Sequence, residues 1–297
     1  MRFFSHLLGK RGRGFKGSRI QVKYLNASKN LQSKNRVDIV IPVLNEAHVL
    51  EKSVGVVREF LKKNLAYPWR IVIVDNGSTD GTFDVATALA RSFRDVESIR
   101  LKVKGRGRAL REAWMRSSAQ VVLYTDVDLS TELEALPKLV HALIEEGYDI
   151  AIGSRLARAS KTQRCFKREI ISRIYNIFLK TLLLTRFTDA QCGFKALTRE
   201  VVDKVVPQVK DQGWFFDTEL LVLAEKQGYR IKDIPVTWIE DDDSRVKIIP
   251  TALEDIRGVL RLRWLLWRDR LSRSGKSGNR RLREDSSHKP VSNSPDQ

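Results

Sequence analysis

Residues 121–131 read VVLYTDVDLST, and this stretch decides the fold that we expect. The apolar run that begins at Val121 predicts a strand buried on both faces, as in a parallel sheet. Asp126 and Asp128 follow it, and on an extended chain their side chains would point the same way. Two like charges so close repel each other unless a cation or a tuned carboxylate pair is present. The stretch therefore predicts a metal site, with a solvated strand-end loop as the simpler alternative.

The surrounding chain alternates between strand-like and helix-like segments. Apolar runs predict strands, and periodic apolar positions predict helices. The expected strands are 37–42, 70–75, 97–101, 119–125 and 148–154, and the expected helices are 46–63, 81–93, one opening at 105–114, and 131–146. Such alternation predicts an α/β fold, a mostly parallel sheet with helices on both faces.

Polar clusters fall at the carboxyl ends of these strands, where ligands bind in parallel sheets. They read PVLNE (42–46), DNGSTDGT (75–82), DVDLST (126–131) and GSR (153–155). Asp75 could accept from a base N–H, although an Asx-type turn is the simpler reading. Glu46 opens a helix, where its charge is also stabilising. In KVKGRGRALR (102–111), Lys104 or Arg106 could lie near phosphates, or the loop could merely open a helix.

The formal net charge of +18 lies mostly at the two ends of the chain. Residues 1–36 contain ten Lys or Arg and no acid, and residues 268–297 contribute +4, so the 37–267 domain carries only +4. Basic ends favour polyanions, meaning nucleic acid or an anionic membrane surface. We expect the arm to lie on a membrane surface or to be disordered, and the Ser/Gly-rich tail to be disordered.

Compartment and membrane signals point to a peripheral protein. The two cysteines, Cys165 and Cys192, lack metal-ligand spacing, which favours a reducing compartment. No uncharged apolar stretch reaches the ~18 residues that a membrane-spanning helix requires. Residues 168–187 have helical apolar spacing flanked by arginine and lysine, and residues 259–270 mix tryptophan with arginine. Each could lie in a headgroup layer, although 168–187 could equally be a core helix. We expect a cytoplasmic protein, peripheral on the inner membrane face.

Taken together, these motifs resemble the family 2 glycosyltransferases, whose nucleotide-sugar domain has the GT-A fold. Within that family the likeness is to dolichyl-phosphate glucosyltransferases and related polyprenyl-phosphate enzymes. It covers about residues 37–267. Besides the strand-end clusters, the residues that carry it are GRGRA (105–109), DAQCGFKALTRE (189–200), WFFDTELL (214–221), PVTW (235–238), SRVK (244–247) and RLRW (261–264).

The resemblance implies roles for individual residues. For the nucleotide-sugar site it implies Pro42, Asn45, Glu46, Asp75, Asn76, Arg106 and Asp126. For Mg²⁺ or Mn²⁺ held against the diphosphate it implies Asp126 and Asp128, and for the acceptor phosphate it implies Arg155, Arg168 and Ser172. Asp189 and Asp217 would complete the catalytic set by orienting acceptor or sugar hydroxyls, although either could be structural. Asn76 departs from the family, which usually has a second aspartate there.

The activity that the resemblance implies is inverting transfer of a hexose, with glucose from UDP-glucose as the expected donor sugar, to a dolichyl or polyprenyl phosphate. The alternatives are transfer to a polysaccharide or a protein, and the GDP-mannose version of the lipid-phosphate reaction. A non-enzymatic nucleic-acid binder would explain the basic ends but not the strand-end carboxylates, so we expect no nucleic-acid partner.

Overall fold

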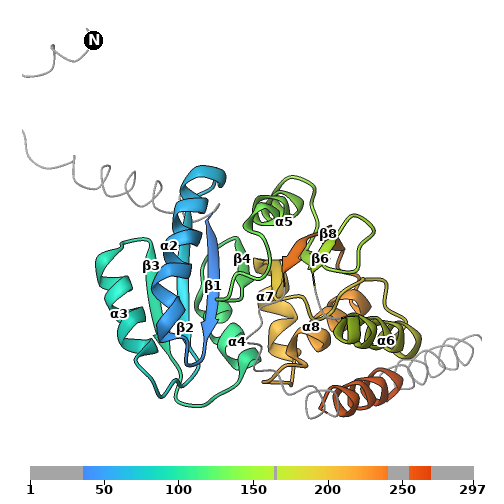
Figure 1. The fold of residues 1–297 in the computed structure, drawn as a ribbon. Helices are drawn as coiled ribbons and strands as arrows, with labels where there is room; N and C mark the ends of the chain where they lie inside the picture. Colours follow the sequence, from blue (N-terminus) through green and yellow to red (C-terminus); the bar gives the residue numbers. More distant parts are fainter. Residues whose placement is uncertain (1–35, 164–165, 240–253, 269–297) are drawn as a thin grey trace, which may run out of the picture.

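The computed structural model describes residues 36–163, 166–239 and 254–268, without the side chains of residues 163–172. Its centre is a seven-stranded sheet in the order β3-β2-β1-β4-β7-β5-β8 (Figure 1). The strands are β1 (Val37–Val43), β2 (Trp69–Asp75), β3 (Val96–Arg100), β4 (Val121–Thr125), β5 (Ile150–Ser154), β7 (Phe194–Thr198) and β8 (Ile231–Pro235). All neighbours pair in parallel except β7, which is antiparallel to both β4 and β5. The expected mostly parallel sheet is confirmed.

Helices cover both faces of the sheet. The α-helices are α2 (Ala47–Asn64), α3 (Thr82–Ser92), α4 (Arg106–Arg116), α5 (Leu136–Ile144), α6 (Phe166–Leu183), α7 (Arg199–Lys204), α8 (Phe216–Lys226) and one over 254–268. Two short 3-10 turns are Leu133–Ala135 and Val206–Gln208. A small second sheet pairs β6 (Lys161–Gln163) with β9 (Thr237–Ile239).

Each face of the sheet has its own apolar core. Buried side chains of α2, α3 and α5 pack on one face, and those of α4, α6, α7, α8 and helix 254–268 pack on the other. The central strands contribute to both cores because alternate side chains point to opposite faces. On β4, for example, Leu123 lies in the first core and Tyr124 in the second. The continuous apolar run that predicted a doubly covered strand is thereby explained.

Two expectations around the DVDLST stretch are wrong in detail. Strand β4 ends at Thr125, and Asp126 to Leu129 form a turn in which Leu129 has a φ of 53°. The two aspartates therefore do not sit on an extended chain. The helix expected from Thr131 begins instead at Leu136, after a 3-10 turn, because Thr131 forms a β-bridge with Trp238.

Within the residues that the structure describes, none of the helices combines the length and the apolarity needed to cross a bilayer. The arm 1–36, except Arg36, and the tail from 269 lie outside the described residues, as does the SRVK motif at 244–247.

Candidate active site

Hydrogen bonds join the turn that follows β1 to the turn that follows β2. The Asn45 amide N–H donates to Ser78 Oγ (2.9 Å), and Asn45 Oδ1 accepts from the Thr79 N–H (2.8 Å). The Glu46 N–H donates to Thr82 Oγ1 (2.8 Å). Asn45 has a φ of 58°, a region that asparagine tolerates better than most residues. Asn45 and Glu46 thus hold the two turns together, and Pro42 lies beside Val74 in the sheet.

Asp75 ends β2 as a fully buried carboxylate with unused hydrogen-bonding capacity. Its Oδ1 accepts from the Ser78 N–H (3.0 Å). Its Oδ2 lies 3.4 Å from Arg100 Nε as an ion pair but accepts no hydrogen bond. Buried carboxylate oxygens normally accept hydrogen bonds, so Oδ2 is suited to an N–H supplied by a ligand. The neighbouring Asn76 uses its Oδ1 to accept from the Gly105 N–H (2.8 Å), which ties β2 to the start of α4.

Asp126 lies in the turn after β4 with 42% of its side chain exposed. A Cβ on residue 193 would come within 1.7 Å of Asp126 Oδ2, so this close approach requires Gly193. Asp128 is exposed, and its Oδ1 accepts from the Ser130 N–H (3.0 Å). Two accessible carboxylates in one turn are suitable donors for Mg²⁺ or Mn²⁺. Among the described residues no third His, Cys, Asp or Glu completes a cluster, so a bound diphosphate would have to supply further oxygen ligands.

Arg106, at the first turn of α4, connects two of the predicted carboxylates. Its Nη2 lies 2.7 Å from Asp126 Oδ1, and its Nη1 lies 2.6 Å from Asp217 Oδ2. The guanidinium also lies over the rings of Tyr124 and Trp214. The close packing of α4 against α8 depends on Gly107, because a Cβ on that residue would lie 2.4 Å from the Cβ of Phe216 on α8. Arg106 therefore bridges the predicted metal ligand Asp126 and the buried Asp217.

Asp217, on α8, is bonded by three side chains. Besides Arg106 it contacts Lys195 Nζ (3.1 Å) and accepts from the Tyr124 hydroxyl (2.7 Å). Burial alone would raise the pKa of Asp217, but Lys195 and Arg106 outweigh it and lower that pKa. Lys195 and Tyr124 were not predicted as site residues. The lysine of the DAQCGFK motif was a usable signal, since a lysine in the middle of an apolar strand requires a buried charge partner.

Arg155 and Asp189 form a closed pair at the carboxyl end of β5. Asp189 is fully buried and accepts from Arg155 Nε (2.7 Å), Nη2 (2.9 Å) and the backbone N–H (3.1 Å). Burial opposes ionisation, but Arg155 prevails and the pKa of Asp189 falls to about 2. In this arrangement Arg155 Nε and Nη2 are both used by Asp189. Arg168 and Ser172 lie in the first turns of α6, outside the residues whose side chains are described.

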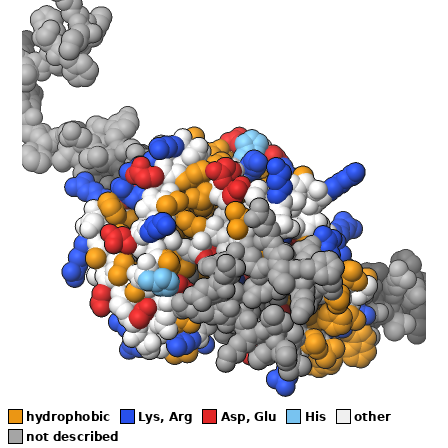
Figure 2. Space-filling model, in the orientation of Figure 1, with side chains coloured by type: hydrophobic (Ala, Val, Ile, Leu, Met, Phe, Trp, Pro, Cys, Tyr) orange, Lys and Arg blue, Asp and Glu red, His pale blue; other side chains and the backbone are white. Residues whose placement is uncertain are grey.

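Two adjacent helices, α6 and 254–268, carry an exposed apolar surface. Arg263 Nη1 donates to Leu182 O (2.9 Å), which joins helix 254–268 to α6. We call the exposed residues of the two helices the apolar surface; they are Ile174, Ile177, Ile256, Leu260, Trp264 and Trp267. Figure 2 shows hydrophobic side chains grouped at the lower right, where Figure 1 places these helices. The opposite sides of both helices belong to the core, through residues such as Leu179 and Val259. The expected core role of residues 168–187 is thus confirmed for one side of the helix, the other side is apolar and exposed, and the helix ends at Leu183.

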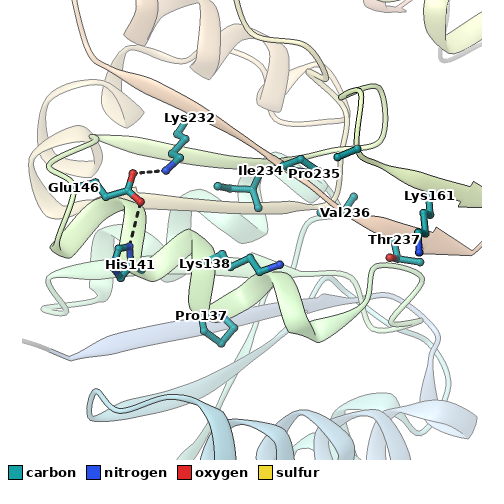
Figure 3. Close-up of a pocket in the computed structure, with 11 residues that line it drawn as sticks. Pro137, Lys138, His141, Glu146, Lys161, Lys232, Ile234, Pro235, Val236 and Thr237 are labelled. Atoms are coloured by element: carbon teal, nitrogen blue, oxygen red, sulfur yellow. Dashed lines mark hydrogen bonds and ion pairs between the residues drawn. The ribbon is translucent and has the colours of Figure 1, made fainter.

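A cavity of about 710 Å³ lies away from these residues, between α5 and β8 (Figure 3). Lys138, Lys161 and Lys232 line it, and Lys232 pairs with Glu146. None of the predicted site residues lines this cavity. The candidate active site is therefore defined by the strand ends and not by this hollow.

Comparisons with known proteins identify the family of this chain. Residues 38–206 match the profile of glycosyl transferase family 2. Glycosyltransferase AglD of Haloferax volcanii is 34% identical over 77% of this chain and 37% of that protein. Dolichyl-phosphate beta-glucosyltransferase of Dictyostelium discoideum is 28% identical over 79% of this chain and 77% of that protein.

Among solved structures, glucosyl-3-phosphoglycerate synthase from Mycobacterium tuberculosis, in complex with Mn²⁺, UDP and glucosyl-3-phosphoglycerate, aligns with a TM-score of 0.58. It is 18% identical and the alignment covers 86% of each chain, so it shows the shared fold. The predicted fold and family are confirmed. The chain belongs to glycosyl transferase family 2 and is a glycosyltransferase with the GT-A fold.

Proposed function

We propose that this chain transfers glucose from UDP-glucose to a dolichyl or polyprenyl phosphate while bound peripherally to the cytoplasmic face of a membrane. The observation that carries the proposal is the apolar surface on α6 and helix 254–268. Gln191, two residues after Asp189, contacts this second helix by donating to Asp255 Oδ2 (2.6 Å). A sugar-phosphate acceptor is polar and gains nothing from such a surface, and a polysaccharide could stack on its two tryptophans but not on its isoleucines and leucine. A long isoprenoid tail and the bilayer that holds it can contact all of these side chains. Dolichyl-phosphate glucosyltransferases among the relatives support the same acceptor class.

The donor half of the proposal depends on Asp75 and the DVD turn. Asp75 Oδ2 offers a buried acceptor for a base N–H, and the N3–H of uracil fits it. The N1–H of guanine would fit as well, so GDP-mannose belongs in any donor screen. Asp126 and Asp128 would hold Mg²⁺ or Mn²⁺, which neutralises charge on the leaving diphosphate when bound.

The chemistry requires positioning and not a strong base. A phosphate monoester acceptor has a second pKa of ~6, so at neutral pH it is already an anion that can attack the anomeric carbon in line. Asp217 and Asp189 both have lowered pKa values, which makes them weak bases. In this proposal Asp217 orients Arg106 and Asp189 orients Arg155. Arg106 compensates the charge of the leaving diphosphate, and Arg155 compensates that of the acceptor phosphate.

A two-way screen tests the reaction. Purified full-length protein with Mn²⁺ is incubated with UDP-glucose or GDP-mannose, and with a short polyprenyl phosphate, 3-phosphoglycerate or a glucan. We expect glucosyl transfer from UDP-glucose to the polyprenyl phosphate at a rate well above the other combinations. Transfer to 3-phosphoglycerate or to the glucan alone would refute the lipid acceptor, and transfer from GDP-mannose alone would refute the donor.

Vesicle flotation tests the membrane contact separately. Burying the half-exposed side chains of Leu260 and Trp264 contributes on the order of 1 kcal/mol each. The double variant Leu260→Gln, Trp264→Gln should therefore bind vesicles roughly tenfold or more weakly than wild type. The control is Val56→Gln, Met115→Gln, which removes two exposed apolar side chains from other helices. Equal loss in both variants would show that the apolar surface has no special role.

A second arm of the flotation experiment tests the basic ends. Each Lys or Arg near an anionic surface contributes ~1 kcal/mol, and salt weakens it. We expect protein lacking residues 1–30 to lose the preference for anionic over neutral vesicles. Equal, salt-insensitive binding of the full-length chain to both vesicle types would contradict that expectation.

A further inference from the structure

Arg106 forms an ion pair with Asp126, the carboxylate that we expect to bind the metal. The Arg106 side chain is only 13% exposed, and its guanidinium is bonded to Asp126 at 2.7 Å and to Asp217 at 2.6 Å. In the described part of the chain no other cationic side chain forms an ion pair with Asp126. Asp217, in contrast, retains Lys195 and Tyr124 if Arg106 leaves. The two ends of the bridge are therefore unequal, and the Asp126 end is the one that a ligand can replace.

We propose that Arg106 is an internal counter-cation that keeps a divalent ion away from Asp126 until a nucleotide diphosphate binds. This inference rests on the proposed function, because it assumes the metal at Asp126. A divalent ion bound at Asp126 alone would face the guanidinium as a nearby like charge, in a partly desolvated site where such repulsion is strong. A diphosphate removes the conflict, because its oxygens accept the hydrogen bond that the guanidinium now donates to Asp126.

The consequence is positive coupling between the ion and the nucleotide. Each ligand should raise the affinity for the other by the same factor, as thermodynamic linkage requires. Arg106 would thereby ensure that the enzyme takes up the metal together with its donor substrate. The alternative is a fixed strut: Arg106 stays on both carboxylates in every state and affects the ion only through the fold.

Binding of Mn²⁺ to the full-length protein, measured from the EPR signal of the free ion with and without UDP, distinguishes the two. In wild type we expect UDP to tighten Mn²⁺ binding by well over tenfold. Arg106→Gln should bind Mn²⁺ without UDP about tenfold more tightly than wild type, and UDP should then add much less. The matched control is Arg116→Gln, which removes the same charge from the exposed end of the same helix, where Arg116 pairs with Glu112.

Arg106→Lys is a second variant that keeps the positive charge but lacks the two-pronged guanidinium needed to contact both carboxylates. In this variant the coupling between Mn²⁺ and UDP binding should lie between that of wild type and that of Arg106→Gln. Arg106→Lys also serves if Arg106→Gln does not fold, as judged by circular dichroism. Coupling in Arg106→Lys equal to wild type, or Mn²⁺ affinity in Arg106→Gln that is unchanged or weaker without UDP, would overturn the inference.

The same titrations separate this inference from the proposed function. Wild-type protein that binds Mn²⁺ equally well with and without UDP refutes the role of Arg106 and leaves the metal site standing. Wild-type protein that binds no Mn²⁺ even with saturating UDP refutes the metal site, and the inference falls with it.

Discussion

We call the region around the ends of β1, β2 and β4 the nucleotide half, and the region around Asp189, Asp217 and α6 the acceptor half, after their predicted roles. The carboxylates of the two halves differ in exposure and in hydrogen bonding. In the nucleotide half, Asp75 Oδ2 accepts no hydrogen bond and Asp126 is 42% exposed. In the acceptor half, Asp189 and Asp217 are almost completely buried, and each has a lowered pKa because cationic side chains surround it. Among Asp75, Asp126, Asp189 and Asp217, the carboxylate oxygens that are accessible or lack a hydrogen bond therefore lie on the nucleotide side. The acceptor-side carboxylates hold the cations that build the site.

Removing an acceptor-side carboxylate should mainly cost stability. Asp189→Asn leaves the Arg155 guanidinium buried without its charge partner, and breaking a buried pair in this way costs about 3–5 kcal/mol. The free energy of unfolding, from urea titration at pH 7, measures the loss. The control is Asp203→Asn, which breaks an exposed pair with Arg199 on α7 and should cost less than about 1 kcal/mol. Equal stability of the two variants would remove the contrast between the halves.

Removing a nucleotide-side carboxylate should mainly cost activity. Asp126→Asn loses a charge where the leaving diphosphate is stabilised, so we expect kcat/KM to fall roughly 10²–10³-fold, as for loss of one transition-state contact. Urea titration of the same variant should stay within about 1 kcal/mol of wild type, since Arg106 retains Asp217. We expect Asp128→Asn to behave similarly. Full Mn²⁺-dependent turnover in Asp128→Asn would contradict its assignment as a metal ligand.

Arg168 tests whether the acceptor half also recognises a phosphate. It lies one helical turn before Ser172 on α6, which puts the two residues on one face of the helix. A lysine cannot reproduce a forked guanidinium–phosphate contact, so Arg168→Lys should lose about 1.5–3 kcal/mol, or roughly ten- to a hundredfold in kcat/KM for polyprenyl phosphate. The Kd for UDP should not change. Wild-type transfer by this variant would leave Arg168 as an ordinary surface residue.

Asp255, on helix 254–268, is the exception among the buried acceptor-side carboxylates. Burial raises its pKa to about 6, the carboxylates of Asp211 and Glu254 add to the effect, and hydrogen bonds from Gln191 and Tyr175 oppose it. Because the folded pKa exceeds the unfolded value, the folded chain binds the proton more tightly. Wild-type stability should therefore fall as pH rises from about 4 to 6.

Asp255→Asn removes that dependence and keeps an acceptor for Gln191 Nε2, now 2.6 Å from Asp255 Oδ2. We expect the free energy of unfolding of the variant at pH 7 to exceed that of wild type by on the order of 2 kcal/mol. This difference in stability should shrink toward pH 4.5. Thermal melts of both proteins at the two pH values provide the measurement. A difference that is the same at both pH values would show that the carboxyl does not titrate in this range.

The sequence predicted the ends of strands β2 and β4 well because the signals for them are local. A buried strand followed by a polar turn and a helix places Asp75 or Asp126 at the sheet edge without any knowledge of distant contacts. The bridge from Arg106 to Asp217 joins residues 111 positions apart, and no local pattern encodes it. The start of α5 was misplaced for the same reason, since the bridge between Thr131 and Trp238 competes with the helix pattern.

The position of β7 has a consequence for synthesis of the chain on the ribosome. Strands β1 to β4 can pair as soon as they emerge, but the outer partner of β4 is β7, whose residues follow about 70 positions later. At roughly 5–20 residues per second, the edge of β4 stays open for roughly 4–15 s. An unpaired apolar strand of this kind invites association between nascent chains. This interval is the part of biogenesis in which a chaperone has most to protect.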